Sequence, residues 1–183
     1  MPAQRNVGEP IVAAAEVLSR VFDAPRPLVF EVWTKAEHFT HWFGPHGAEV
    51  VSCEIDPRPG GIIRFGHRSG EGMTLYLKGT FREVVQDQRL VFTIGFIDER
   101  GRPARHPMFP DLPLEFLLET TVVLEDVPGG TRVKVAQRAT PSGIASHPAV
   151  IRHLELACEG WKQVFERLGE HLSATQGREE HRA

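Results

Sequence analysis

The stretch from residue 48 to residue 140 repeatedly alternates apolar and polar residues with a period of two, and this pattern constrains the fold most strongly. In "TRVKVAQRAT" one register contains Arg132, Lys134 and Arg138, and the other contains Val133, Val135 and Gln137. Successive side chains of a strand point to opposite faces of a sheet, so these segments predict strands with one buried face. Turn sequences such as "DPRPGG" and "VPGG" separate them. A mostly antiparallel meander is therefore expected.

Six strands are expected in this stretch, at residues 50–55, 62–69, 73–84, 89–97, 115–126 and 131–140. A further strand, "EVLSRVFDAP", precedes them and ends at Asp23 or Ala24, because the prolines that follow suit only the first turn of a helix. The total is seven strands.

Two short helices are expected after the first strand. The first spans Pro25 to Trp33, and the capping-box spacing of Thr34 and Glu37 predicts that the second begins there. Gly44 and Pro45 then end it. A short helix is stable only when an apolar face docks on the protein, so its aromatic residues are expected to act as anchors.

The longest helix is expected near the C-terminus, at residues 147–173. Its apolar residues recur at three- and four-residue steps, namely Val150, Leu154, Cys158, Trp161, Phe165, Leu168 and Leu172. Gly160 interrupts this helix, which predicts a close approach to another backbone.

Length and composition indicate one domain in a reducing compartment. The chain has 183 residues, enough for a single core, with a flexible leader at 1–10, a domain at 11–173 and a disordered polar tail at 174–183. The net charge of −3 gives no basic surface for nucleic acid or an anionic membrane. Cys53 and Cys158 lie in apolar stretches, which favours a cytoplasmic protein. We find neither a signal peptide nor an apolar run long enough to span a membrane.

Several motifs resemble, in order, those of the heat-shock-protein-90 ATPase activator-like family: "RVFDAPRPLVFEVWTKAEHFTHWFGP", "DPRPGG", "GTFREVVQDQRLVFT", "GGTRVKV" and "EGWKQVFERLGEHL". This AHSA-type family belongs to the START-like, or SRPBCC, helix-grip superfamily. The resemblance implies an α+β helix-grip fold, in which a curved antiparallel seven-stranded sheet wraps around a long C-terminal helix. It also implies a hydrophobic cavity between sheet and helix.

One segment departs from the family pattern. The fifth and sixth strands are usually joined by a short hairpin, whereas residues 98–113 intervene here, and long loops are often functional. Met108, Phe109 and Leu112 are apolar residues that a solvent loop has little reason to carry. We expect them to form a lid over the cavity mouth, near Trp42 and Phe43, or else a contact with a second subunit in a homodimer.

Polar residues in inward registers are the candidate ligand contacts. They are Gln137, Thr120 and His67, and each is open to a second interpretation as a core group satisfied by a neighbour or by buried water. Leu75, Leu77 and Phe81 are expected to form an apolar wall, because they share the inward register of their strand. Trp42 and Phe43 have two open interpretations: they serve only as core anchors, or one of them also borders the cavity mouth. Trp161 and Phe165 of the long helix complete the expected ligand-binding set.

Catalytic and metal-binding signals are weak. The sequence contains no G-x-S-x-G, phosphate-loop or H-E-x-x-H motif. His38, His41 and His46 have suggestive spacing, but we interpret them as surface residues and expect no metal and no cofactor. Cys53 and Cys158 sit in apolar registers, where the thiolate is suppressed.

Three function classes remain. We favour a binding module for a small hydrophobic or aromatic molecule. The second class is a cofactor-free enzyme of the cyclase or hydrolase kind, in which His67 and another polar group act as acid or base. The third is a protein-binding domain such as the chaperone regulator that names the family.

Overall fold

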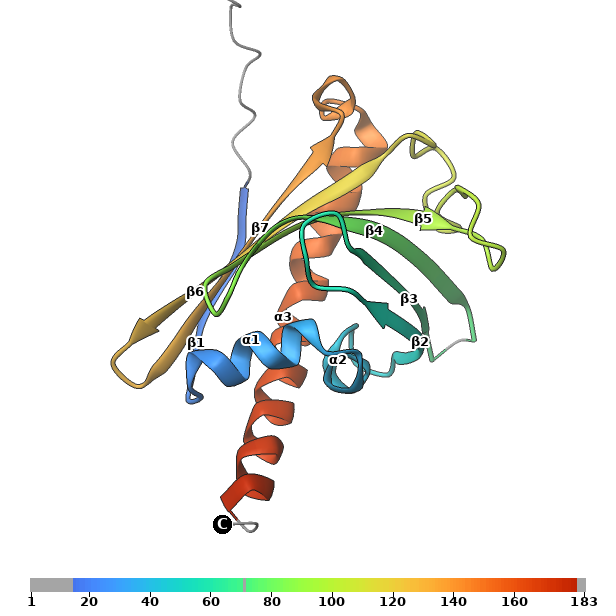
Figure 1. The fold of residues 1–183 in the computed structure, drawn as a ribbon. Helices are drawn as coiled ribbons and strands as arrows, with labels where there is room; N and C mark the ends of the chain where they lie inside the picture. The colour runs from blue at the N-terminus through green and yellow to red at the C-terminus, as the bar shows by residue number, and fades with distance from the viewer. Residues whose placement is uncertain (1–14, 71, 181–183) are drawn as a thin grey trace, which may run out of the picture.

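The alternating segments form one antiparallel sheet in the computed structural model, which describes residues 15–70 and 72–180 (Figure 1). In this part of the chain the sheet has seven strands. They are β1 (Ala15–Phe22), β2 (Glu49–Ile55), β3 (Ile62–Arg68), β4 (Thr74–Val85), β5 (Arg89–Ile97), β6 (Leu117–Val127) and β7 (Gly130–Thr140). Their order is β1-β7-β6-β5-β4-β3-β2, so consecutive strands pair from β2 to β7 and β1 returns beside β7. The predicted meander is confirmed.

The sheet is strongly curved, and irregularities in its pairing accompany the curvature. The β4–β5 register shifts between Phe81 and Glu83, and the β2–β3 register shifts between Val50 and Ser52. Extra residues of this kind increase local bending and twist. A Cβ atom at Gly79 would overlap the Thr93 carbonyl oxygen, so the closeness of β4 and β5 here requires glycine.

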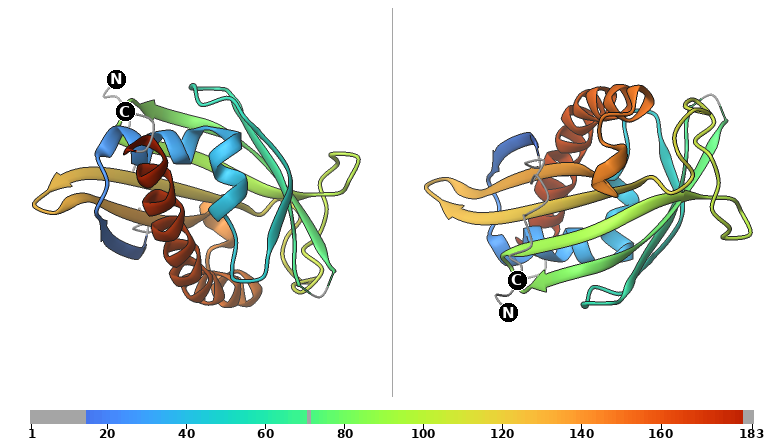
Figure 2. Two further views of the ribbon diagram at one scale, coloured as in Figure 1. Left: turned by 90° about the horizontal axis from the view of Figure 1, so that it is seen from below. Right: turned by 90° about the horizontal axis from the view of Figure 1, so that it is seen from above.

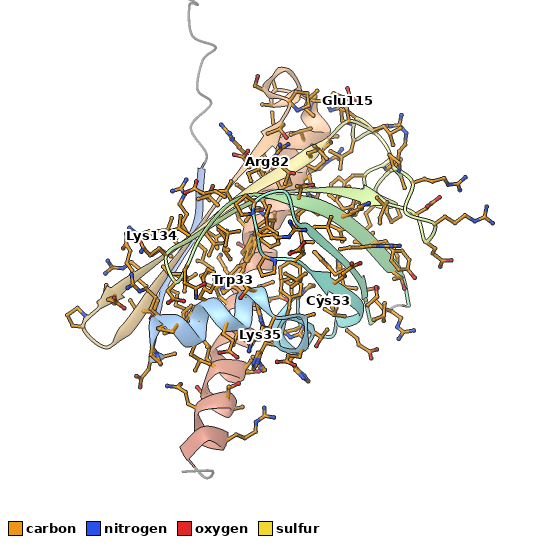
Figure 3. The ribbon with its side chains drawn as sticks, viewed as in Figure 1. Trp33, Lys35, Cys53, Arg82, Glu115 and Lys134 are labelled. Atoms are coloured by element: carbon orange, nitrogen blue, oxygen red, sulfur yellow. The ribbon has the colours of Figure 1, made fainter. Side chains whose placement is uncertain are left out.

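The helices lie on the concave side of the sheet (Figures 1 and 2). They are α1 (Arg26–Thr34), α2 (Ala36–Trp42) and α3 (Pro148–Glu180), and a 3₁₀ turn, η1 (Ser142–Ile144), precedes α3. In Figure 3, Trp33 lies between α1 and the sheet, while Arg82 and Lys134 lie on the outer side. This arrangement confirms the expected α+β helix-grip fold, with a long C-terminal helix held inside the curved sheet.

An aromatic cluster joins α1 and α2 to the middle of α3. The Trp33 ring packs edge-on against Trp42 at 4.7 Å and stacks on Trp161 at 6.0 Å between centroids. Trp42 is fully buried, and its indole Nε1 donates a hydrogen bond to the Val32 carbonyl at 2.9 Å. Phe165 packs edge-on against Phe22 of β1. The anchoring role predicted for the aromatic residues of α2 is consistent with this packing.

An arginine of α3 fixes the chain where α2 ends. The Arg167 guanidinium donates to the carbonyl oxygens of Phe43, Gly44 and Pro45 at 3.3, 3.0 and 3.1 Å, and to that of His41 at 3.2 Å. The last carbonyl groups of a helix have no partner within the helix, so a cation that binds them satisfies the helix end. This contact holds the "FGP" segment against α3.

The long loop at residues 98–113 packs on the first half of α3. Phe109 and Leu112 are buried in a second apolar cluster with Phe116, Ala149 and Val150, whereas Trp42 and Phe43 belong to the first cluster. This corrects the expected position of the loop near Trp42 and Phe43. Met108 is 63% exposed, so its side chain covers nothing within the described residues.

Two smaller expectations, about a helix end and about the mid-helix glycine, are wrong. Thr34 does not cap α2, because it is the last residue of α1 and its hydroxyl donates to the Phe30 carbonyl at 2.7 Å. The N-cap of α2 is Lys35. Gly160 makes no close approach, since a Cβ atom there would meet nothing within 4 Å.

The last helix is also longer than expected. It continues to Glu180, so residues 174–180, assigned to a disordered tail from their polarity, are helical. Side-chain bonds to carbonyls one turn earlier, such as Thr175 to His171 at 2.8 Å, accompany this extension. The predicted leader at 1–10 and residues 181–183 lie outside the described residues. None of the described helices is both long and apolar enough to span a membrane.

Two substitutions in the long loop test its packing. Leu112→Ala is expected to lower the free energy of unfolding by about 2–5 kcal/mol, because Leu112 is 1% exposed and its truncation leaves a cavity. Met108→Ala in the same loop is the matched control and is expected to change the free energy of unfolding by less than about 0.5 kcal/mol. Urea denaturation of both variants gives the comparison. Equal effects would show that the loop does not pack on α3 as described.

Candidate functional site

A cavity of about 210 Å³ lies between the concave face of the sheet and α3. It is located between the two apolar clusters and takes lining residues from both. The sheet contributes Phe65, His67, Leu75, Leu77, Phe92, Ile94, Phe96, Leu118, Thr120 and Gln137. The remaining lining residues are Phe43, Gly44, Pro45 and His106 from loops, and His153, Ala157, Gly160, Trp161 and Val164 from α3.

The cavity exists because α3 presents small residues to the concave face of the sheet. Ala157 and Gly160 supply almost no side-chain volume at the centre of the lining. Leu75, Leu77 and Leu118 lie in inward registers but are only partly buried, since they face unfilled space. Interiors are normally packed to the density of organic crystals, so an unfilled apolar volume of this size is a feature that requires explanation.

Gln137 and Thr120 form a polar pair in the apolar wall. They are opposite each other on β7 and β6, and the Gln137 amide Nε2 donates to the Thr120 hydroxyl at 3.1 Å. Gln137 is 6% exposed, and its Oε1 has no hydrogen-bond partner among the described residues. A buried amide oxygen without a partner is costly, so this atom is available to a ligand donor or to water.

Three histidines gather at one end of the cavity. His67 comes from β3, His106 from the long loop and His153 from the first half of α3. Burial lowers the pKa of His67 and of His153. The pKa of His106 falls to about 4 through burial first and then through the neighbouring His153 and His67.

Seven of the ten residues expected to bind ligand line this one cavity. They are Phe43, His67, Leu75, Leu77, Thr120, Gln137 and Trp161. The structure places Trp42, Phe81 and Phe165 in the core instead. Trp42 turns inward to reach the Val32 carbonyl, Phe81 packs edge-on against Phe92, and Phe165 packs against Phe22.

Of the three residues expected in a lid, none lines the cavity. Phe109 and Leu112 are buried beside α3 and Met108 is exposed, but His106 of the same loop reaches the lining. Sequence reasoning missed His106 because an irregular loop has no period that assigns a face. It also missed His153, although His153, Ala157, Gly160 and Trp161 share one helical face, and that spacing is a signal that could have found it.

The histidines considered for a metal lie elsewhere and dock α2 on α3. His38 Nδ1 is 3.0 Å from His171 Nε2, and the His41 ring stacks on that of His171. His46 pairs with Glu166 at 2.6 Å. Burial, followed by the nearby His38 and His41, lowers the pKa of His171 to about 4. Within residues 15–70 and 72–180, no group of three His, Cys, Asp or Glu side chains has the arrangement of a metal site.

A double-mutant cycle tests the polar pair. Gln137→Leu and Thr120→Val are each expected to cost about 1–3 kcal/mol of stability, because each strands a buried partner. The double variant is expected to cost clearly less than the sum, since it removes both partners together. Thr121→Val, on the opposite face of β6, is the control. Strict additivity in urea denaturation would contradict the pairing.

Comparisons with known proteins agree with this architecture. The family model described as "Activator of Hsp90 ATPase homolog 1-like protein" matches residues 23–173. No curated protein sequence is a significant match.

Among solved structures, a protein of Nitrosomonas europaea is 25% identical, with a TM-score of 0.68 over 87% of this chain and 94% of its own. A protein of Arthrobacter aurescens is 21% identical, with a TM-score of 0.69 over 90% and 92%. The AHSA1 protein of Silicibacter pomeroyi is 22% identical, with a TM-score of 0.64 over 86% and 96%. The likeness covers the whole fold. The resemblance in the sequence motifs is therefore confirmed, and the chain belongs to the family of Activator of Hsp90 ATPase homolog 1-like proteins.

Proposed function

We propose that the protein binds one small hydrophobic or aromatic molecule in the cavity between the sheet and α3. The observation that carries this proposal is the unfilled apolar volume around Leu77, Gly160 and Trp161. Small-molecule sites are typically concave and mostly apolar, with a few polar groups that orient the ligand. Gln137, Thr120 and the three histidines are such groups here.

The volume sets the size of the molecule. An engineered apolar cavity of about 150 Å³ holds benzene. The cavity here, at about 210 Å³, is suited to a molecule larger than a single benzene ring, such as a two-ring aromatic compound. The neighbouring rings of Phe43, Phe65 and Trp161 provide aromatic surfaces for it.

The proposed setting is the cytoplasm, without a nucleic-acid partner. Cys53 and Cys158 are unpaired thiols, and burial raises the pKa of Cys53 to about 11, so that it remains a thiol. This cysteine behaves as a small apolar residue rather than as a nucleophile. The net charge of −3 supports the absence of a nucleic-acid surface.

Two substitutions that fill the cavity test the proposal. Gly160→Leu and Leu77→Trp each place bulk in the lining and are expected to weaken binding of 2-methylnaphthalene by at least about tenfold, or about 1.4 kcal/mol. Leu156→Trp is the matched control, because Leu156 is a 54% exposed residue of α3 outside the lining. Fluorescence titration measures affinity and stoichiometry, and denaturation curves check that each variant is folded.

The expected result is one site in the parent protein and in the control, with loss of affinity in both filled variants. Folded variants that bind the probe as tightly as the parent would exclude this cavity as the binding site. A parent protein that binds no probe would reject the proposed function.

A further inference from the structure

The three histidines of the cavity form a polar end in an otherwise apolar lining. The His106 and His153 ring centroids are 5.7 Å apart, and the Phe96 ring lies edge-on to both, at 4.7 and 5.8 Å. His67 is close enough to lower the pKa of His106. Three basic side chains from three separate elements therefore meet at one place.

The part of the chain that the structure describes supplies no counter-ion to these histidines. Among the described residues, no Asp, Glu, Lys or Arg lines the cavity. The charged neighbours on the same elements are engaged elsewhere: Arg152 lies over the Phe109 ring, and Arg68 pairs with Glu49. Arg105 donates to two carbonyl groups of its own loop. Burial without a carboxylate keeps the imidazoles neutral near pH 7.

The hydrogen-bonding capacity of this end is only partly used. The backbone N–H of Met108 donates to His106 Nδ1 at 3.0 Å, so the neutral His106 ring carries its proton on Nε2 and offers a donor. His67 Nδ1 is buried and has no hydrogen-bond partner within the described chain.

We propose that the histidine end binds the carboxyl group of a small aromatic or aliphatic monocarboxylic acid, with uptake of one proton. This inference rests on the proposed function, because the apolar part of the acid occupies the same cavity. A carboxylate accepts hydrogen bonds at two oxygens and supplies the negative charge that the imidazoles lack. A neutral hydrocarbon would leave His67 Nδ1 unmatched.

The proton balance follows from the charges. The free acid is ionised near pH 7, because carboxyl groups titrate near pH 4, and the free histidines are neutral. One proton from solvent neutralises the bound pair, whether it resides on an imidazole nitrogen or on a carboxyl oxygen. An anion nearby raises the pKa of a histidine, so this proton is held in the complex. Affinity is therefore expected to fall by about tenfold per pH unit in the neutral range.

A comparison of 2-naphthoate with 2-methylnaphthalene tests the proposal. Titration calorimetry at about pH 6.5 and about pH 7.5, in buffers of different ionisation enthalpy, measures both affinity and proton uptake. We expect 2-naphthoate to take up about one proton and to bind about tenfold tighter at the lower pH. The affinity of 2-methylnaphthalene is expected to be the same at both pH values.

Matched histidine variants locate the effect. His67→Gln and His153→Gln are each expected to weaken 2-naphthoate binding at the lower pH by about tenfold and to leave 2-methylnaphthalene binding nearly unchanged. His46→Gln is the control, because His46 is exposed, pairs with Glu166 and is outside the lining. The two cavity variants lie on different elements, so misfolding of one still leaves the other as a test.

The outcomes separate the two proposals. Binding of 2-methylnaphthalene together with pH-independent or absent binding of 2-naphthoate would overturn the carboxyl site and leave the cavity function standing. Failure of both compounds to bind would reject both proposals. An affinity for 2-naphthoate at the lower pH that is unchanged in both folded cavity variants would also overturn the assignment to these histidines.

Discussion

The structure depends on how α3 is fastened to the concave side of a strongly curved sheet. The aromatic cluster of Trp33, Trp161 and Phe165 holds the middle of α3, and Arg167 binds the carbonyl groups at the end of α2. The first half of α3 is held by the apolar cluster that the 98–113 loop builds around Leu112. Between these two attachments the side chains of α3 and of the sheet leave a volume unfilled.

Small residues of α3 keep this volume open. Gly160 and Ala157 lie between the two attachments of α3. A larger side chain at Gly160 would have filled the space without a clash, because a Cβ atom there meets nothing within 4 Å. An alanine in place of Gly160 would also favour the helix by about 1 kcal/mol. A glycine at this position makes the helix less stable and leaves the volume open. Destabilising residues of this kind occur in natural proteins chiefly at functional sites. The histidines then give the open volume one polar end.

The sequence predicted the fold and much of the lining because both follow from regular periods. Alternation in β6 and β7 correctly assigned Thr120 and Gln137 to the inner face. Position along a strand was harder to predict. Phe81 is also on the inner face, but it lies further along β4 and packs in the core against Phe92. His106 and Arg167 had no usable signal, since one lies in an irregular loop and the other depends on where α2 ends.

A crystal structure of the protein under xenon pressure tests the central claim most directly, because xenon occupies apolar cavities without requiring a specific ligand. We expect a xenon site bordered by Leu77, Gly160 and Trp161, away from the histidine end, with the surrounding side chains nearly unmoved. Side chains that close the space between the sheet and α3, leaving no xenon there, would contradict it.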